Sequence, residues 1–390
     1  MRSTQKLMEA NINNIKLQTY QTVPKKDNIH LSTARGDSYN VLDNFYITTR
    51  GMGKSAVFWS KLYNYWKNLG RSGIVLRTIQ ADITEAYLDD IEKLLNKFRC
   101  TADYVKISYK KGSIKDGVVD VFIQEPGDKE KYLFIRVIAL GIKVTRYKSL
   151  IIRNPSMVGY DEFIPNTRLG EKWLPDAPWR VKELYSTFAR ECDGYVLKRY
   201  WFGNPYSRYI PYLLNYYKID TLKLQPGDFI HGKNYIIDLQ KPKPELIELL
   251  KKQNPDLLNE IDEEWTRFMN GEFINDENYI IEPQEPQGYS LRWVFRIANH
   301  YLGCFRTGDT NDWDGDFGCD WYVKMLPDDW KSNKRDIYAV NFDNLVDGTK
   351  LITATDKTNT QILKNAIAQR KVVFRDANSA YLLQSIYTLL

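Results

Sequence analysis

The chain has 390 residues, of which 43% are hydrophobic and 14% aromatic, and it carries a formal net charge of +6. This length predicts about two to three domains, and the hydrophobic content is sufficient for more than one core. No apolar run approaches the roughly 18 residues of a membrane-spanning helix, so none is expected. The polar N-terminus lacks the apolar region of a signal peptide. The mild basic excess permits nucleic-acid binding without requiring it.

The sulfur and imidazole side chains are too few and too scattered for common metal or disulfide patterns. Cys100, Cys192, Cys304 and Cys319 are widely spaced, and only three histidines occur. The cysteines fit neither a zinc motif nor a disulfide framework, so we expect free thiols in a reducing compartment. A histidine-based metal site or a Ser-His relay is not expected.

The first structured element in chain order follows a polar stretch of 40 residues. Residues 41–47 form a strand-like apolar run, residues 56–65 have a helical pattern, and Thr48 to Ser55 between them read Thr-Thr-Arg-Gly-Met-Gly-Lys-Ser. This matches G-x-x-x-x-G-K-[ST] except that Thr48 replaces the first glycine. Strand, loop and helix in this order favour a phosphate-binding loop over a glycine turn that happens to precede Lys-Ser.

Such a loop wraps phosphates with backbone N–H groups, while its lysine reaches the β- and γ-phosphates and its final hydroxyl binds Mg²⁺. We therefore predict an ATP site with Lys54 on the phosphates and Ser55 on the metal ion. The predicted nucleotide-binding residues of the loop are Thr49, Arg50, Gly51, Met52, Gly53, Lys54 and Ser55.

The next segments alternate between strand and helix patterns. Gly73–Arg77 is a predicted strand, and Asp82–Phe98 has apolar residues on one helical face. Tyr104–Tyr109, Val118–Gln124 and Lys131–Ile138 resemble a β meander with a turn between the last two strands.

A second nucleotide-site element is expected at Met157–Tyr160, a short apolar strand that ends in Asp161 and Glu162. Open α/β sheets bind ligands at the carboxyl ends of their strands. In P-loop enzymes the aspartate would hold Mg²⁺ and the glutamate would act as general base on the attacking water. The alternative is an acidic pair in a solvated turn.

The following helix and strand are predicted at Pro178–Glu191 and Tyr195–Phe202. Alternation of strands and helices up to this point argues for an α/β fold with a mostly parallel sheet covered on both faces.

The remainder of the chain changes character at Lys241-Pro242-Lys243-Pro244, which signals a linker. Helices are predicted at Glu245–Lys252 and Pro255–Met269, and a compact α+β region follows. Its predicted elements are Leu291–Asn299, Leu302–Arg306, Trp321–Met325, Ile337–Val340, Thr360–Ala368, Lys371–Phe374 and Ser379–Tyr387. We therefore predict three parts: a P-loop ATPase domain at 1–235, a helical linker at 236–285, and an α+β domain at 286–390.

The Arg-Gly-Met-Gly-Lys-Ser loop, the Tyr-Asp-Glu-Phe-Ile box and the order of segments around them resemble the genome-packaging ATPases of small short-tailed bacteriophages. These phi-twenty-nine-like proteins are terminase-type motors of the additional-strand P-loop class. Their loop begins Gly-x-Arg-Gly-x-Gly-Lys-Ser, so Arg50 fits the family pattern and Thr48 departs from it. The resemblance implies a P-loop ATPase fold, a linker, and a ribonuclease-H-like C-terminal domain without a nuclease site.

Four further residues take roles only through this resemblance. It implies that Lys148 and Arg190 act on nucleotide bound by a neighbouring subunit, Arg190 as an arginine finger that stabilises the γ-phosphoryl charge. It places Asn204 as the sensor of the γ-phosphate and Arg77 near the nucleotide. The alternatives are a solvated loop lysine, a helix-terminal arginine favoured by the helix dipole, and a plain strand-end charge.

The resemblance also implies that basic residues line the pore of a ring and grip duplex DNA. Arg168 lies in the loop that would face the pore, whereas Gln80 stands where the family has a lysine. Movement along arbitrary sequence requires phosphate contacts, because these carry no sequence information.

The C-terminal domain is expected to dock rather than cut. A two-metal nuclease needs carboxylates clustered on adjacent strands, and Trp293–Ala298 contains none. An acidic run does follow in the sequence, comprising Asp309, Asp312, Asp314, Asp316 and Asp320. It fails the EF-hand spacing, because Gly318 is one place late and Val323 occupies the twelfth position. A solvated hairpin loop is the better interpretation.

The function implied by the resemblance is an ATP- and Mg²⁺-dependent motor that pumps double-stranded DNA into a preformed capsid as a homo-oligomeric, pentameric ring. Its partners would be the portal protein, the capsid vertex and any structural RNA there, and it would act in the host cytoplasm while docked on the procapsid. Two alternatives stay open: a terminase that also cleaves DNA, and a structural protein that binds ATP without turnover, for which Thr48 is the best support.

Overall fold

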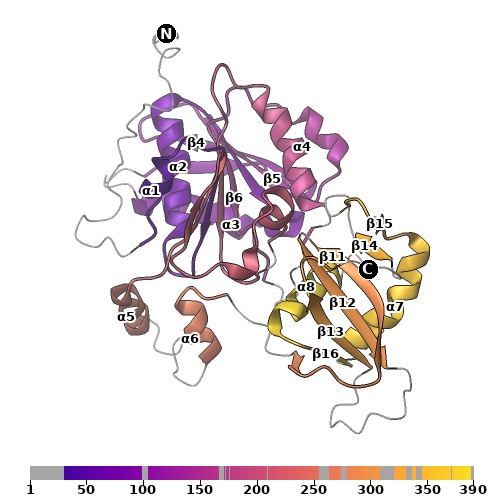
Figure 1. Ribbon diagram of the computed structural model, residues 1–390. Helices are drawn as coiled ribbons and strands as arrows, with labels where there is room; N and C mark the ends of the chain where they lie inside the picture. Colours follow the sequence, from indigo (N-terminus) through magenta and orange to yellow (C-terminus); the bar gives the residue numbers. More distant parts are fainter. Residues whose placement is uncertain are drawn as a thin grey trace. The chain divides into compact units, whose positions relative to one another are not determined.

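The computed structural model describes residues 30–98, 104–166, 171, 173–174, 176–208, 210–253, 263–273, 279–297, 299–307, 320–330, 336–339, 345–369 and 371–387. These residues belong to two compact units (Figure 1). The first unit lies within Met1–Tyr206 and Gln225–Ile274, and the second within Ser207–Leu224 and Asn275–Leu390.

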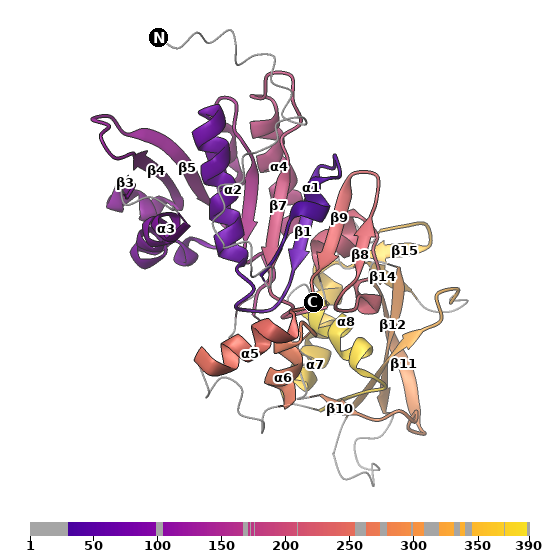
Figure 2. The ribbon, with the colours of Figure 1, turned by 90° about the vertical axis from the view of Figure 1, so that its left-hand side faces the viewer.

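The first unit is built on one sheet, which has nine strands in the described part of the chain. The strands are β1 (Asp43–Ile47), β2 (Gly73–Arg77), β3 (Lys106–Tyr109), β4 (Val118–Gln124), β5 (Tyr132–Ala139), β6 (Val158–Asp161), β7 (Arg199–Gly203), β8 (Phe229–His231) and β9 (Tyr235–Leu239). Their order is β3-β4-β5-β2-β6-β7-β1-β9-β8, which Figure 2 shows from β3 at the left to β8 at the right.

The central strands from β5 to β9 run parallel, and antiparallel strands close both edges. Strand β7 lies between β1, which leads into the glycine loop, and β6, which ends in Asp161. A strand inserted at this place defines the additional-strand class of P-loop folds. The predicted α/β fold with a mostly parallel sheet is therefore confirmed.

Helices cover both faces of the sheet, which passes between α2 and α4 in Figure 1. The helices of this unit are α1 (Ala34–Asp37), α2 (Lys54–Leu69), α3 (Glu85–Phe98), α4 (Ala177–Ala189), α5 (Pro244–Gln253) and α6 (Glu263–Met269). Side chains alternate along β7: Tyr200 and Phe202 join the core with α2, and Trp201 points to the opposite face. Arg199 shares the Trp201 face and stacks on Tyr185 of α4.

Gly159 in the middle of β6 is required by close packing. A Cβ atom at this position would lie 2.0 Å from Cε2 of Phe58, which is fully buried on α2. The glycine therefore lets the helix after the loop approach the strand that carries Asp161, and it does not weaken the strand assignment.

The second unit contains a seven-stranded sheet in its described residues, of order β10-β16-β13-β12-β11-β14-β15. Its elements are β10 (Ile280–Ile281), β11 (Tyr289–Ile297), β12 (His300–Thr307), β13 (Trp321–Leu326), β14 (Ile337–Ala339), β15 (Thr349–Leu351), α7 (Ala354–Ala368), β16 (Val372–Phe374) and α8 (Ala377–Tyr387). Strands β11 to β13 form an antiparallel meander, and β14 and β15 extend it in parallel beside β11. This is the ribonuclease-H-like arrangement expected from the sequence.

Two features differ from the sequence-based expectation. The hairpin of β8 and β9 was not predicted, and β9 pairs in parallel with β1, so the first unit continues past the boundary expected at residue 235. Residues 207–224, between β7 and β8, group with the second unit and contain a π-helix at Tyr212–Tyr216 and a 3-10 turn at Thr221–Lys223. Both features depend on contacts between distant parts of the chain.

Two further expectations from the sequence concern the acidic run of the C-terminal part and the absence of a membrane-spanning helix. Of the acidic run, Asp309 to Asp316 lie outside the described residues and only Asp320 is inside them. In the described part of the chain no helix is long and apolar enough to span a bilayer.

We predict that Gly159→Ala destabilises the protein by roughly 1–3 kcal/mol, because Phe58 and its neighbours must move to admit the new methyl group. Urea unfolding measures this as a lower midpoint. Gly112→Ala is the matched control, since a Cβ atom there meets nothing within 4 Å. Equal midpoints for the two variants would contradict the packing argument.

Candidate active site

The glycine loop joins β1 to the 16-residue helix α2, and its two glycines are needed for their backbone conformation. Gly51 and Gly53 have φ values of 80° and 81°, in the left-handed region that other residues adopt with strain. Gly53 is the N-cap of α2, and no described side chain caps it. The first-turn N–H groups and the positive end of the helix dipole are therefore suited to bind an anion.

Thr48, the departure from the usual motif, fits its position without strain. Its backbone is not in the left-handed region, so no glycine is required there. Its N–H group donates to the carbonyl of Gly203 at 3.1 Å, and its hydroxyl donates to the carbonyl of Gln240 at 2.8 Å. The side chain is buried and anchors the loop to the end of β9.

The ammonium group of Lys54 is held by three oxygens. It donates to the carbonyls of Thr48 and Thr49 at 2.7 and 2.6 Å, and to Oδ1 of Asn204 at 2.8 Å. Three acceptors match the three N–H groups of a charged lysine. Burial lowers the pKa of Lys54 to about 7, against the opposing effect of the negative charges of Asp161 and Glu162. A bound triphosphate would stabilise the charged form.

Two carboxylates follow β6 and differ in exposure. Asp161 is buried at the end of the strand, whereas Glu162 adopts a φ of 56° and its side chain is 55% exposed. Arg77, which ends β2, lies beside both: its Nη2 donates to Oε2 of Glu162 at 3.0 Å, and its Nη1 lies 3.7 Å from Oδ2 of Asp161. Arg77 thus fixes the direction of the exposed carboxylate.

These charges form one electrostatic unit. Burial raises the pKa of Asp161 to about 6, and the positive charges of Arg77 and Lys54 oppose this rise. Because β6, β7 and β1 are adjacent and parallel, their carboxyl ends lie at one edge of the sheet. The structure therefore brings together the predicted loop, Asp161 and Glu162, with Arg77 and Asn204 beside them.

Tyr206 and Gln240 also contact the loop and were not predicted from the sequence. Nε of Arg50 donates to the hydroxyl of Tyr206 at 3.0 Å, and the ring of Tyr206 stacks on Phe268 of α6 at 5.3 Å. The sequence indicates these two residues only by their positions. Tyr206 lies two residues after Asn204, and Gln240 directly follows Tyr235–Leu239, a strand that was not predicted.

For the remaining predicted residues the structure shows fewer contacts with the rest of the site. Ser55 lies in the first turn of α2. Arg190 ends α4, is exposed, and donates from Nε to the carbonyl of Ser186 in its own helix at 3.1 Å. The backbone of Lys148 lies in a 3-10 segment, Val144–Ser149. Arg168 lies outside the described residues.

The residues present fit a magnesium-bound triphosphate. Glycine-loop amides and Lys54 suit phosphate oxygens, and Ser55 and Asp161 offer the oxygen ligands that Mg²⁺ prefers. Glu162 is exposed on the same edge of the sheet, where it can accept a proton from water.

The fold and the site together define a P-loop domain of the additional-strand class. Comparison of the sequence with protein-family models gave no match, and comparison with curated proteins gave none either. The fold, by contrast, has matches among solved structures that span nearly the whole chain.

Two of these structures are phage packaging motors. One is described as the Phi-28 gp11 DNA packaging motor; it is 14% identical, with a TM-score of 0.55 over 92% of this chain and 97% of that chain. The other is the bacteriophage Phi-29 viral genome packaging motor assembly, 17% identical, with a TM-score of 0.54 over 93% of this chain and 99% of that chain. The chain shares their fold, so the resemblance expected from the sequence is confirmed at that level.

We predict that Lys54 makes the stability of the nucleotide-free protein rise with pH. Its pKa in the folded protein is about 7, below its ordinary value of 10.5, so the unfolded chain binds more protons between these values. The free energy of unfolding should increase by at most about 1.4 kcal/mol per pH unit above pH 7, and Lys54→Met should lose this increase. Urea unfolding at pH 7 and pH 9 measures it.

The exposed Lys129→Met is the control for this measurement. The Lys54→Met variant and the control should differ in pH dependence. Parallel pH profiles for both variants and the wild type would mean that Lys54 is solvated in the folded protein.

Proposed function

We propose that this protein is an ATP-hydrolysing motor that translocates double-stranded DNA into a preformed viral capsid. The observation that carries the proposal is a similarity in fold to two phage packaging motors that spans both units of the chain. The glycine loop, Asp161 and Glu162 meeting at one edge of the sheet support ATP as the fuel.

Each site residue has a defined part in hydrolysis. The loop amides and Lys54 would bind the phosphates, and Ser55 and Asp161 would hold a magnesium ion, which would screen the phosphate charge. Glu162 orients a water molecule and takes its proton as the water oxygen bonds to the γ-phosphorus and the bridging oxygen leaves with ADP. Arg77 keeps the carboxylate of Glu162 in position, and Asn204 links Lys54 to the end of β7.

Arg190 is proposed to act on the nucleotide of a neighbouring copy. It is exposed at the end of α4, and its hydrogen bond to the carbonyl of Ser186 is made by Nε and not by the terminal nitrogens. An arginine supplied between subunits can contribute about 10³–10⁵ in rate. We propose the same kind of role for Lys148. Both roles require a homo-oligomeric ring, which we propose to be a pentamer.

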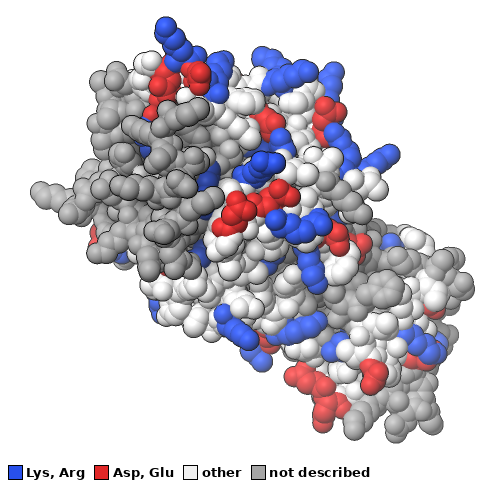
Figure 3. Space-filling view, turned by 90° about the horizontal axis from the view of Figure 1, so that it is seen from above, with Lys and Arg blue, Asp and Glu red and all other residues white. Residues whose placement is uncertain are grey.

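DNA contact is proposed to use the phosphate backbone. On the face shown in Figure 3, Lys and Arg side chains are interspersed with Asp and Glu. On this face the positive charge is not gathered into a single patch, which suits several weak contacts per subunit. Arg168 stays the proposed DNA contact of the pore-facing loop. The proposed partners are the portal protein, the capsid vertex and any structural RNA, met while the motor is docked on the procapsid in the host cytoplasm.

The competing interpretation, nucleotide binding without turnover, rested on Thr48. That position accommodates threonine without strain, and the threonine hydroxyl adds a hydrogen bond to the carbonyl of Gln240, so the departure is no sign of a decayed loop. The glycine loop, Asp161 and Glu162 also follow strand ends at one edge of the sheet, which favours turnover.

We predict that Glu162→Gln lowers DNA-stimulated ATP turnover by about 10²–10⁴-fold while nucleotide binding is retained, because the amide cannot accept the proton from water. Lys54→Ala should lose both binding and turnover, since the phosphates lose their buried positive charge. A steady-state ATPase assay with duplex DNA and a binding assay with a fluorescent ADP test this. Glu130→Gln, on an exposed turn, is the control. If the wild-type protein hydrolyses no ATP, either with or without DNA, the proposal of a motor is rejected.

We predict that Arg190→Ala and Glu162→Gln subunits, each inactive alone, recover partial ATPase activity when mixed on procapsids. In the mixed ring some sites combine an intact Glu162 with an intact Arg190 from the neighbour. A mixture of Lys54→Ala and Glu162→Gln subunits is the control, because both residues act in the same subunit and no site can be completed. Equal activity of the two mixtures would rule out action of Arg190 between subunits.

A further inference from the structure

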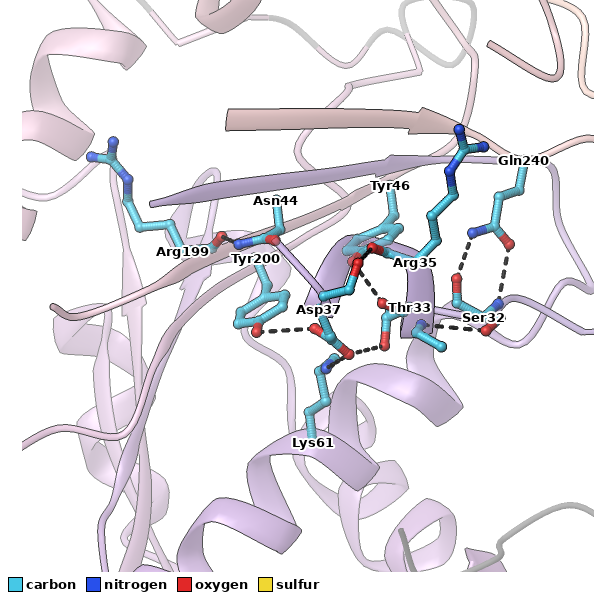
Figure 4. A network of polar contacts seen from close by, with 12 residues as sticks. Ser32, Thr33, Arg35, Asp37, Asn44, Tyr46, Lys61, Arg199, Tyr200 and Gln240 are labelled. Carbon is cyan, nitrogen blue, oxygen red and sulfur yellow. Dashed lines mark hydrogen bonds and ion pairs between the residues drawn. The ribbon is translucent and has the colours of Figure 1, made fainter. Parts of the chain in front are cut away.

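Gln240 lies directly after β9 and connects two segments that are distant in sequence. Its side-chain amide pairs with the peptide groups of Ser32: the Ser32 N–H donates to Oε1 at 3.1 Å, and Nε2 donates to the Ser32 carbonyl at 2.5 Å (Figure 4). Nε2 also donates to Oδ2 of Asp238 at 2.6 Å. This two-point recognition fixes both the distance and the direction of the segment around Ser32.

The same segment reaches the far side of the glycine loop. The N–H group of Leu31 donates to the carbonyl of Met52 at 2.8 Å. At the near side of the loop, the hydroxyl of Thr48 donates to the backbone carbonyl of Gln240 at 2.8 Å. Hydrogen bonds therefore connect Thr48 to Gln240, Gln240 to Ser32, and Leu31 to Met52. Together with the backbone of the loop from Thr48 to Met52, they form a closed ring.

The segment that completes this ring is itself held rigidly. Asp37, at the end of α1, accepts hydrogen bonds from Lys61 of α2 at 2.6 Å and from the Thr33 hydroxyl at 2.7 Å (Figure 4). The hydroxyl of Tyr200 on β7 donates to its other oxygen at 3.3 Å. Residues 31–37 are therefore tied to β7 and to α2 by contacts that do not involve the loop.

We propose that Thr48 and Gln240 are positioning residues that fix the spacing between the two ends of the phosphate loop. The usual first glycine gives the loop freedom, whereas here a hydroxyl anchor restricts it. The inference rests on the nucleotide binding proposed above. A loop held at one spacing loses less conformational freedom when its amides close on phosphates, so the anchor increases nucleotide affinity.

The decisive test is to replace Thr48 with the glycine that the usual motif has at this position. Thr48→Gly restores the usual residue, yet it should weaken binding of a fluorescent ADP with Mg²⁺ by about 2- to 10-fold, the range expected for one lost hydrogen bond. Thr48→Val, which keeps the shape and loses the hydroxyl, should weaken it similarly. Thr48→Ser keeps the hydroxyl and should bind like the wild type. Thr48→Gly binding as tightly as the wild type would overturn the inference.

The second arm tests Gln240 through its side chain. Gln240→Leu loses both hydrogen bonds to Ser32 and the one to Asp238, and it should weaken ADP binding and raise the KM for ATP more than it lowers kcat. Gln240→Glu can still accept from the Ser32 N–H group, but its carboxylate cannot donate and would meet the carboxylate of Asp238 and the Ser32 carbonyl, so it should not restore the wild-type affinity. Gln124→Leu is the control, because it loses one hydrogen bond, to the carbonyl of Asp128, on a strand far along the sheet.

Thermal unfolding without nucleotide separates positioning from general damage. The inference is supported if both variants lower Tm by the same amount but only Gln240→Leu weakens ADP binding. Unchanged affinity in both variants overturns it while leaving the motor proposal intact. If the wild type binds no ADP, the proposed function and this inference fail together.

Discussion

The alignment of β6, β7 and β1 is the constraint on which the site depends. These three parallel strands are hydrogen-bonded neighbours, so Asp161, Gly203 and Ile47 end at one edge of the sheet. The glycine loop, the two carboxylates and Asn204 then need no long loops to meet, because each follows directly from the end of a strand. The ammonium group of Lys54 completes the arrangement by bonding to two loop carbonyls and to Asn204. Phe58 packed against Gly159 keeps α2, and with it the loop, close to β6.

Local sequence predicted much of this arrangement. The strand before the loop, the helix after it and the strand ending in Asp161 have strong periodicity and short connections, so each was found within a few residues of its true limits. The three strands of the second unit's meander were predicted for the same reason, although their antiparallel pairing was not. The partners of the loop could not be predicted in this way. Gln240 and Tyr206 contact it across more than 150 residues of sequence, and no local pattern encodes such a contact. The hairpin of β8 and β9 was missed although Tyr235–Leu239 is an apolar run after a Gly-Lys-Asn turn.

Thr48 illustrates how a motif can mislead. A consensus glycine suggests that the backbone there needs unusual dihedral angles, and a threonine then indicates decay. In this chain only Gly51 and Gly53 of the loop have positive φ, while Thr48 directly follows β1, has no positive φ and is hydrogen-bonded to the ends of β7 and β9. The physical requirement lies in the two later glycines, which are present. Departures from a motif are therefore best judged by the conformation at each position.

The path of the chain between its two units has a consequence for how they are connected. The polypeptide passes from one unit to the other after Tyr206, after Leu224 and after Ile274. The two units are therefore joined by three covalent passages and not by a single tether. The first passage leaves the ATPase-type sheet two residues beyond Asn204, which touches Lys54. Asn204 is thus joined to the segment of the second unit that starts at Ser207 by a covalent route of only three residues.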